Sequence, residues 1–311
     1  MDPPQTIGID PSVSDLFPPA VLVERLEDVP TTIAVIDEGG DPAGYDGVIT
    51  FEYREAQLSA DPSWIHCVLA GVDAFPLAAL EAQSIALTNS TGIHGDAVGE
   101  TVLGYMLQFA RRLHRHRDAE DAREWEYPDW NVPFTLRGET VCVVGLGTLG
   151  RGVAARADAV GMDVVGVRRT PTPVEHVDRL YTPDSLSEAV SEARFVVLTV
   201  PLTDRTRGLV GADELAAMRE DAYLVNVARG PVVDQDALVE TLRTKGLAGA
   251  ALDVTDPEPL PDDSPLWEMD DVVVTPHAAA ATRDYVDRVA TIVRENLRRL
   301  KAGESLANRV V

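Results

Sequence analysis

Three side chains with complementary chemistry each follow an apolar run that predicts a buried strand. They are Arg229, Glu258 and His277. Because the carboxyl ends of parallel strands meet at one crevice, we expect the three side chains to lie together. An arginine binds a carboxylate with paired hydrogen bonds, a histidine moves a proton near neutral pH, and a neighbouring glutamate orients the ring. With a hydride donor, these groups suit reduction of a 2-keto acid. Taken singly, each has a plainer alternative: a capping arginine, a surface-turn glutamate or a loop histidine.

The stretch from Thr140 to Arg169 predicts a site for a dinucleotide. Gly145, Gly147 and Gly150 have the spacing G-x-G-x-x-G between two apolar runs, and an alanine-rich segment that favours a helix follows them. In such a unit the first glycine allows a tight turn, the second lets the backbone approach a pyrophosphate, and the third lets the helix pack on the strand. An ordinary tight turn between strand and helix is the alternative.

Two arginines, Arg168 and Arg169, stand at the end of the second apolar run, where an NAD site usually has an acid. A guanidinium cannot accept a hydrogen bond from a ribose hydroxyl, but its forked N–H groups bind a 2′-phosphate. We therefore predict NADPH as the coenzyme and NADH as a weaker substitute. A pair of solvated surface arginines is the alternative.

The charge of the chain is strongly negative. Its 311 residues include 51 acids and 27 bases, for a formal net charge of −24, and the only lysines are Lys245 and Lys301. Such a surface repels nucleic acid and anionic membranes, so neither is an expected partner. It also repels an anionic coenzyme. Salt at about 1 M would relieve this repulsion, because it shortens the screening length to about 3 Å. We hypothesise a halophilic protein from a salt-rich cytoplasm; an acidic protein at ordinary salt is the alternative.

The remaining composition indicates a globular cytoplasmic protein. No run of about 18 apolar residues is present, so no membrane span is expected. Cys67 and Cys142 lie inside apolar runs, which favours buried free thiols and a reducing compartment over a disulfide. No metal site is predicted.

Alternating apolar runs and helical segments predict an α/β protein with two doubly wound parallel sheets. The expected strands are 6–10, 32–36, 47–51, 64–70 and 85–88, then 141–144, 164–167, 195–200, 223–227, 247–254 and 272–275. The expected helices, besides the alanine-rich one, are 18–26, 76–82, 96–116, 186–193, 213–218, 234–244 and 281–302.

An acidic connector after the 96–116 helix carries Trp125, Tyr127 and Trp130. Aromatic side chains in a charged connector often pack on a partner chain. A simple exposed loop is the alternative.

The stretches NVARGPVVD, ALDVTDPEPLP and VVVTPHAAA resemble the signature blocks of the D-isomer-specific 2-hydroxyacid dehydrogenases. With GLGTLG, VPLTDRTRGLVG and the segment from LTNSTG to ARR, the resemblance covers about residues 60–311. It implies reversible, NAD(P)H-dependent reduction of 2-keto carboxylic acids to D-2-hydroxy acids. A glyoxylate/hydroxypyruvate reductase is the runner-up within the family. A dinucleotide-sensing binding protein is the alternative from another class.

The resemblance also implies a domain plan. A Rossmann coenzyme domain, residues 98–283, is expected inside a flavodoxin-like substrate domain made of residues 1–97 and completed by 284–311. Family members usually form homodimers through their coenzyme domains, so a homodimer is expected.

By the same resemblance, Arg229 binds the substrate carboxylate, His277 is the proton donor in reduction and acceptor in oxidation, and Glu258 pairs with His277. The turn at Gly71 and Val72, which is otherwise a plain turn, offers backbone N–H groups to the substrate carboxylate. Asp253 would hold the nicotinamide carboxamide. The positions expected to line the coenzyme are Thr101, Gly145, Leu146, Gly147, Thr148, Leu149, Gly150, Arg168, Arg169, Val200, Pro201, Thr206, Val227, Ala228, Asp253 and Ala279.

Overall fold

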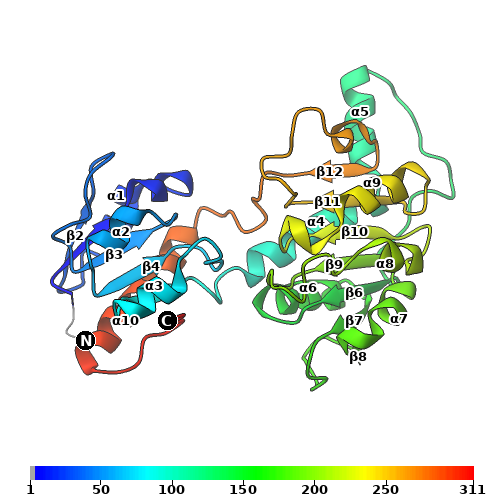
Figure 1. Cartoon of the computed structure of the whole chain (residues 1–311). Coiled ribbons are helices and arrows are strands. Elements are labelled where there is room, and N and C mark those ends of the chain that lie inside the picture. The colour runs from blue at the N-terminus through cyan, green and yellow to red at the C-terminus, as the bar shows by residue number, and fades with distance from the viewer. Residues whose placement is uncertain (1–3) are drawn as a thin grey trace. The chain divides into compact units, whose positions relative to one another are not determined.

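The computed structural model describes residues 4–311, which form two compact units (Figure 1). Of the described residues, unit 1 consists of 4–93 with 281–311, and unit 2 of 94–280. The predicted domain boundaries lay between residues 97 and 98 and between residues 283 and 284. The assignment of substrate to one unit and coenzyme to the other stays a prediction.

Unit 1 is a parallel five-stranded sheet with strand order β2-β1-β3-β4-β5. This is the flavodoxin-like order, so the predicted fold class of this part is confirmed. Its strands are β1 Thr6–Ile9, β2 Thr32–Val35, β3 Gly47–Thr50, β4 Trp64–Cys67 and β5 Ala86–Asn89. Its helices are α1 Pro19–Arg25, α2 Glu55–Ser59, α3 Leu77–Ala82 and α10 Tyr285–Ala302, with the 3-10 turn η1 Pro11–Asp15.

The last helix, α10, belongs to unit 1 because its apolar face packs into the core of that unit, with Val289 and Val293 fully buried. Two ion pairs tie α10 to the end of α1. Arg25 Nε lies 2.5 Å from an Asp287 carboxylate oxygen, and Arg294 lies 3.0 Å from Asp28. The first and last parts of the chain therefore fold as one body.

Unit 2 is a parallel seven-stranded sheet with strand order β12-β11-β10-β9-β6-β7-β8. The order reverses between β6 and β9, which makes this a doubly wound Rossmann-type sheet, as predicted. Its strands are β6 Thr140–Val144, β7 Asp163–Val167, β8 Arg179–Tyr181, β9 Phe195–Leu198, β10 Tyr223–Asn226, β11 Gly249–Leu252 and β12 Val272–Val274. Its helices are α4 Gly95–Ala110, α5 Leu113–Ala122, α6 Thr148–Ala159, α7 Leu186–Ser191, α8 Ala212–Ala217 and α9 Gln235–Arg243, with 3-10 turns η2 Pro183–Ser185, η3 Gly230–Val232 and η4 Pro265–Glu268.

The prediction of one helix over 96–116 is wrong. The chain forms α4 and α5 with a break at Arg112, whose φ of 56° is left-handed. Ion pairs explain the break, because Arg112 and His114 both contact Asp271 and Arg115 contacts Asp270. The start of α5 is thus turned toward the segment that enters β12.

The strands and most of the helices otherwise lie where the apolar pattern placed them, with ends that differ from the predicted ones by one to a few residues. The sequence did not predict α2 or the edge strand β8, which pairs with β7. Cys67 and Cys142 are buried and free, as predicted, and burial raises the pKa of Cys67 to about 11.

Candidate active site

The glycine turn lies where the strand order of unit 2 reverses, at the end of β6. Gly145 has φ +98°, a left-handed conformation that favours glycine. A Cβ on Gly150 would lie 1.9 Å from the Gly145 carbonyl oxygen, so only glycine lets α6 approach the strand this closely. Gly147 is exposed and is the N-cap of α6, and a Cβ there would meet nothing within 4 Å. This open backbone at a helix N-terminus fits a pyrophosphate.

The sequence analysis missed one residue of this turn, Thr199. Its buried hydroxyl donates to the Gly145 carbonyl at 2.6 Å and lies 3.1 Å from the Val144 carbonyl oxygen. It therefore fixes the shape of the glycine turn from the neighbouring strand. A polar residue in the apolar run 195–200 was the signal that could have identified it.

Arg168 and Arg169 follow β7, the strand next to β6. Arg168 is half-buried, its backbone N–H donates to the Tyr181 carbonyl, and its Nη1 donates to the Thr172 carbonyl at 3.3 Å. Arg169 is exposed. The unpredicted strand β8 thus helps to hold the backbone of the first arginine.

The other predicted coenzyme positions all belong to unit 2. The buried ones are Leu146, Val227, Ala228 and Ala279, the half-buried ones are Thr101, Thr148, Leu149, Val200 and Thr206, and Pro201 is exposed. The Thr206 hydroxyl donates to the Pro201 carbonyl at 2.6 Å and accepts from the Thr203 N–H at 2.8 Å, so it shapes the loop after β9. Thr101 donates to the Ala279 carbonyl at 2.9 Å.

The three predicted chemical groups follow three adjacent strands: Arg229 follows β10, Glu258 follows β11, and His277 follows β12. His277 Nδ1 lies 3.1 Å from Glu258 Oε2, and both side chains are partly exposed. The other carboxylate oxygen, Oε1, accepts from the Thr255 N–H at 3.2 Å. An ionised carboxylate only accepts, so the hydrogen on Nδ1 points to Glu258, and Nε2 takes no part in this contact.

The segment that carries Arg229 is packed directly against the segment that carries Glu258. Gly230 touches the latter so closely that a Cβ would lie 1.9 Å from the Thr255 carbonyl oxygen. The Asn226 side chain spans the turn, donating to the Arg229 carbonyl at 3.1 Å and accepting from the Ala228 N–H at 3.1 Å. The guanidinium of Arg229 donates to the Ala228 carbonyl at 2.7 Å.

Asp253, at the end of β11, anchors the loop that carries His277. Its buried carboxylate accepts from the Thr275 hydroxyl at 2.7 Å, the Ala278 N–H at 2.8 Å and the Ala279 N–H at 2.9 Å. Its carbonyl accepts from the His277 N–H at 2.8 Å. These bonds hold His277 at φ 53°, a left-handed conformation that is uncommon for a non-glycine residue. The expected contact of Asp253 with a nicotinamide carboxamide stays a prediction.

Gly71 and Val72 lie in unit 1, in the half-buried turn after β4. Asn89 supports the turn through its side-chain N–H, which donates to the Ala70 carbonyl at 2.7 Å. The turn is separate from α3, which begins at Leu77. Its role toward a substrate carboxylate stays a prediction.

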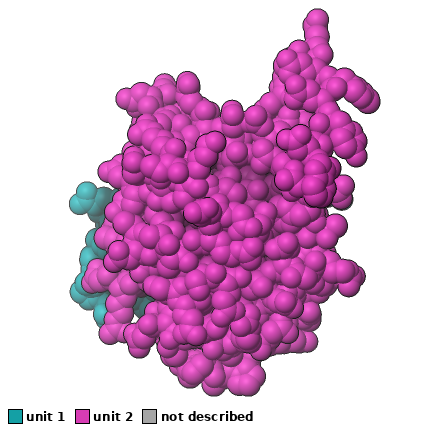
Figure 2. Space-filling model, turned by 90° about the vertical axis from the view of Figure 1, so that its right-hand side faces the viewer, with its two compact units in different colours: residues 1–93, 281–311 teal, residues 94–280 magenta. Residues whose placement is uncertain are grey.

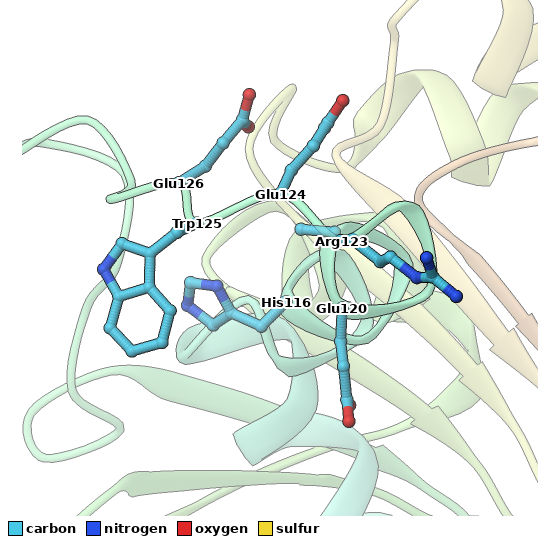
Figure 3. Close-up of a pocket in the computed structure, with 7 residues that line it drawn as sticks. His116, Glu120, Arg123, Glu124, Trp125 and Glu126 are labelled. Atoms are coloured by element: carbon cyan, nitrogen blue, oxygen red, sulfur yellow. The ribbon is translucent and has the colours of Figure 1, made fainter.

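An exposed arm, residues 113–132, projects from unit 2 and reaches its highest point at the end of α5 (Figures 1 and 2). Its large exposed apolar side chains are Leu113, Trp125, Tyr127, Trp130 and Val132. A hollow of about 480 Å³ lies on the arm, where the rings of His116 and Trp125 lie next to each other (Figure 3). None of its lining residues is a predicted coenzyme or substrate contact.

Within residues 4–311, no group of three or more His, Cys, Asp and Glu side chains is arranged to hold a metal ion. The helices of the same region are too short or too polar to cross a bilayer.

Residues 103–279 match the family described as "D-isomer specific 2-hydroxyacid dehydrogenase, NAD binding domain". A glyoxylate reductase of Korarchaeum cryptofilum is 31% identical over 304 residues, which are 95% of this chain and 87% of the relative. A glyoxylate/hydroxypyruvate reductase B of Yersinia pestis is 31% identical over 272 residues, 86% of this chain and 82% of the relative.

Among solved structures, a D-isomer specific 2-hydroxyacid dehydrogenase from Xanthobacter autotrophicus, in complex with NADPH and MES, has a TM-score of 0.84 and 32% identity. The match covers 98% of each chain. The similarity therefore extends over both units of the fold and is not confined to the glycine turn.

Proposed function

The chain belongs to the D-isomer specific 2-hydroxyacid dehydrogenases, and we propose that it reduces 2-keto carboxylic acids to D-2-hydroxy acids, reversibly, with a nicotinamide coenzyme. The observation that carries the proposal is the 3.1 Å contact of His277 with Glu258, in the same sheet that presents the glycine turn. Arg229 follows the adjacent strand β10 in the same sheet, and its guanidinium is a cation suited to a carboxylate.

The residues divide the work as follows. Arg229 binds the substrate carboxylate and draws electron density from the adjacent keto group. His277 donates the Nε2 proton to the keto oxygen, while Glu258 holds the ring through Nδ1. A nicotinamide coenzyme, when bound, supplies the hydride for the keto carbon. In the reverse direction His277 takes the hydroxyl proton.

For the coenzyme, we propose NADPH with NADH as the weaker substitute. Arg168 and Arg169 support this choice, because two guanidinium groups at the end of β7 suit a 2′-phosphate and neither accepts from a ribose hydroxyl. The similar Xanthobacter structure contains NADPH.

Within the substrate class, glyoxylate and hydroxypyruvate are the second candidate, because two of the similar proteins are named for them. Both are 2-keto acids with small third positions or none, and both fit the same roles of Arg229 and His277.

We further propose a cytoplasmic homodimer. The buried free thiols suit a reducing compartment. The exposed aromatic side chains of the arm suit burial against a second copy, because Trp and Tyr are enriched at interfaces. Sedimentation equilibrium tests the assembly, and a monomer at every protein and salt concentration would contradict it.

Loss of NADPH absorbance with a panel of 2-keto acids, in low and high KCl, tests the activity. We expect turnover that His277→Ala reduces by at least about 100-fold, the lower range for positioned proton transfer, with NADPH binding retained. NADPH binding without turnover on any 2-keto acid would indicate a dinucleotide sensor instead.

A further inference from the structure

A buried tyrosine on α4 lies at the back of the His277 loop. The Tyr105 hydroxyl lies 2.7 Å from the Thr275 hydroxyl, which in turn lies 2.7 Å from the Asp253 carboxylate. Tyr105 is 7% exposed and Asp253 is 3% exposed, and the Thr275 side chain between them is half-buried. The sequence analysis assigned no role to Tyr105, and the roles proposed for Arg229, Glu258 and His277 do not use it.

The direction of the two hydrogen bonds follows from the chemistry of the groups. An ionised carboxylate has no hydrogen to give, so the Thr275 hydroxyl donates to Asp253. That hydroxyl has only one hydrogen, so the Tyr105 hydroxyl must donate to Thr275. Burial raises the pKa of Tyr105, and the nearby Asp253 charge acts in the same direction, so the phenol keeps its proton.

This chain of donors ends on the group that shapes the His277 loop. The Asp253 carboxylate also accepts from the N–H groups of Ala278 and Ala279, immediately after His277. Hydrogen bonds in series polarise one another, so a donor at Tyr105 strengthens the bond of Thr275 to Asp253. Without it, the half-buried hydroxyl of Thr275 keeps its bond to Asp253 but loses the hydrogen bond that it accepts from Tyr105.

We propose that Tyr105 is a positioning residue for proton transfer, holding the His277 loop in its left-handed conformation through Thr275 and Asp253. The inference rests on the proposed function for its kinetic consequence, although the structural consequence is independent of it. Tyr105 acts on the alignment of His277 through Thr275 and Asp253, and not through a direct contact with His277 or Glu258.

The kinetic test is a double-mutant cycle with Tyr105→Phe and Thr275→Val. We expect Tyr105→Phe to lower kcat about fivefold, which matches the loss of one net hydrogen bond, while the NADPH Kd stays within about twofold. In the Thr275→Val background, Tyr105→Phe should have no further effect, because the hydrogen-bonded route through the Thr275 hydroxyl is gone. Thr275→Ser keeps the hydroxyl and should restore most of the rate.

The control variant is Tyr223→Phe, which removes another buried tyrosine hydroxyl of unit 2, 4% exposed, at the amino end of β10. It should leave kcat unchanged. Wild-type kcat in Tyr105→Phe, equal loss in Tyr223→Phe, additive losses in the cycle, or a weaker NADPH Kd with unchanged kcat would each overturn the proposal.

A second readout does not need turnover. Hydrogen–deuterium exchange of the peptide that contains Ala278 and Ala279 should be faster in Tyr105→Phe than in wild type and Tyr223→Phe. Unchanged exchange would refute the role of Tyr105 in the loop. Absence of turnover in the wild-type protein would instead refute the proposed function and leave the exchange result to decide the structural inference.

Discussion

Substituting single glycines of the coenzyme turn separates binding from folding. Gly147→Ala adds a methyl group into open space at the N-cap of α6, and the φ of −76° is ordinary for alanine. Gly150→Ala instead places a Cβ 1.9 Å from the Gly145 carbonyl oxygen. The first change obstructs only a ligand that approaches the backbone, whereas the second forces α6 away from the sheet.

The magnitudes follow from these contacts. A methyl group forced into a filled space costs about 1–3 kcal/mol, so Gly147→Ala should weaken NADPH binding about 5- to 150-fold. Its Tm should fall by no more than about 4 °C, since losing a glycine N-cap costs about 1 kcal/mol. Gly150→Ala meets backbone that cannot rotate away, so about 3 kcal/mol and about 6–12 °C in Tm are expected.

Thermal unfolding and NADPH titration of purified variants measure both effects. Gly104→Ala is the control, because Gly104 lies exposed inside α4 with nothing within 4 Å of its Cβ, and alanine there should raise stability slightly. Wild-type NADPH affinity in Gly147→Ala would refute the inference that the pyrophosphate contacts this backbone. A stable Gly150→Ala would refute the packing argument.

Three other predictions concern the coenzyme, the salt and the pH. Arg168→Asp combined with Arg169→Ser should raise the NADPH KM and lower that for NADH, because a carboxylate accepts from a ribose hydroxyl and repels a 2′-phosphate; unchanged KM values for both coenzymes would contradict the assignment. With a net charge of −24, the protein should gain Tm steadily from low to about 1 M KCl, and a flat series would remove the halophilic hypothesis. Burial lowers the pKa of His66 from 6.5 to about 3, so unfolding takes up a proton at acidic pH, and the stability from the neutral ring is present above pH 6.5 and lost progressively toward pH 3. Between pH 6.5 and 5.5, the wild type should lose about 1 kcal/mol more unfolding free energy than His66→Gln, measured by urea unfolding. Equal losses would show that His66 is protonated in the fold.

The sequence predicted the two sheets well because most of their strands are buried on both faces and appear as continuous apolar runs. β8 escaped prediction because Arg179, Leu180 and Tyr181 form a three-residue edge strand without such a run. The helix break at Arg112 also could not be predicted from the neighbouring residues, since no glycine or proline marks it. Its cause is ion pairing with Asp271, which lies 159 positions further along the chain.

The residues of the candidate site likewise divide into those that the sequence predicted and those that it did not. The glycine spacing and the positions of Arg229, Glu258 and His277 after strands carry their own signals, and the structure brings Glu258 and His277 into contact. Tyr105 carries no such signal, because a hydroxyl in a helix gains a role only when the fold brings a hydrogen-bond partner to it. Thr199 stands out only as a polar residue in an apolar run, and the carbonyl that it binds is known only from the fold. Hydrogen bonds between distant segments depend on tertiary structure, which local pattern does not encode.

The strand order of unit 2 has an evolutionary consequence. The glycine turn and the arginines that we propose for nucleotide recognition follow β6 and β7 on one side of the reversal point. Arg229, Glu258 and His277, which we propose for substrate binding and proton transfer, follow β10, β11 and β12 on the other. A lineage can therefore exchange one dinucleotide for another through substitutions after β7 while the acid–base apparatus is inherited intact. In this fold, coenzyme preference can therefore change by substitution without a change in reaction chemistry.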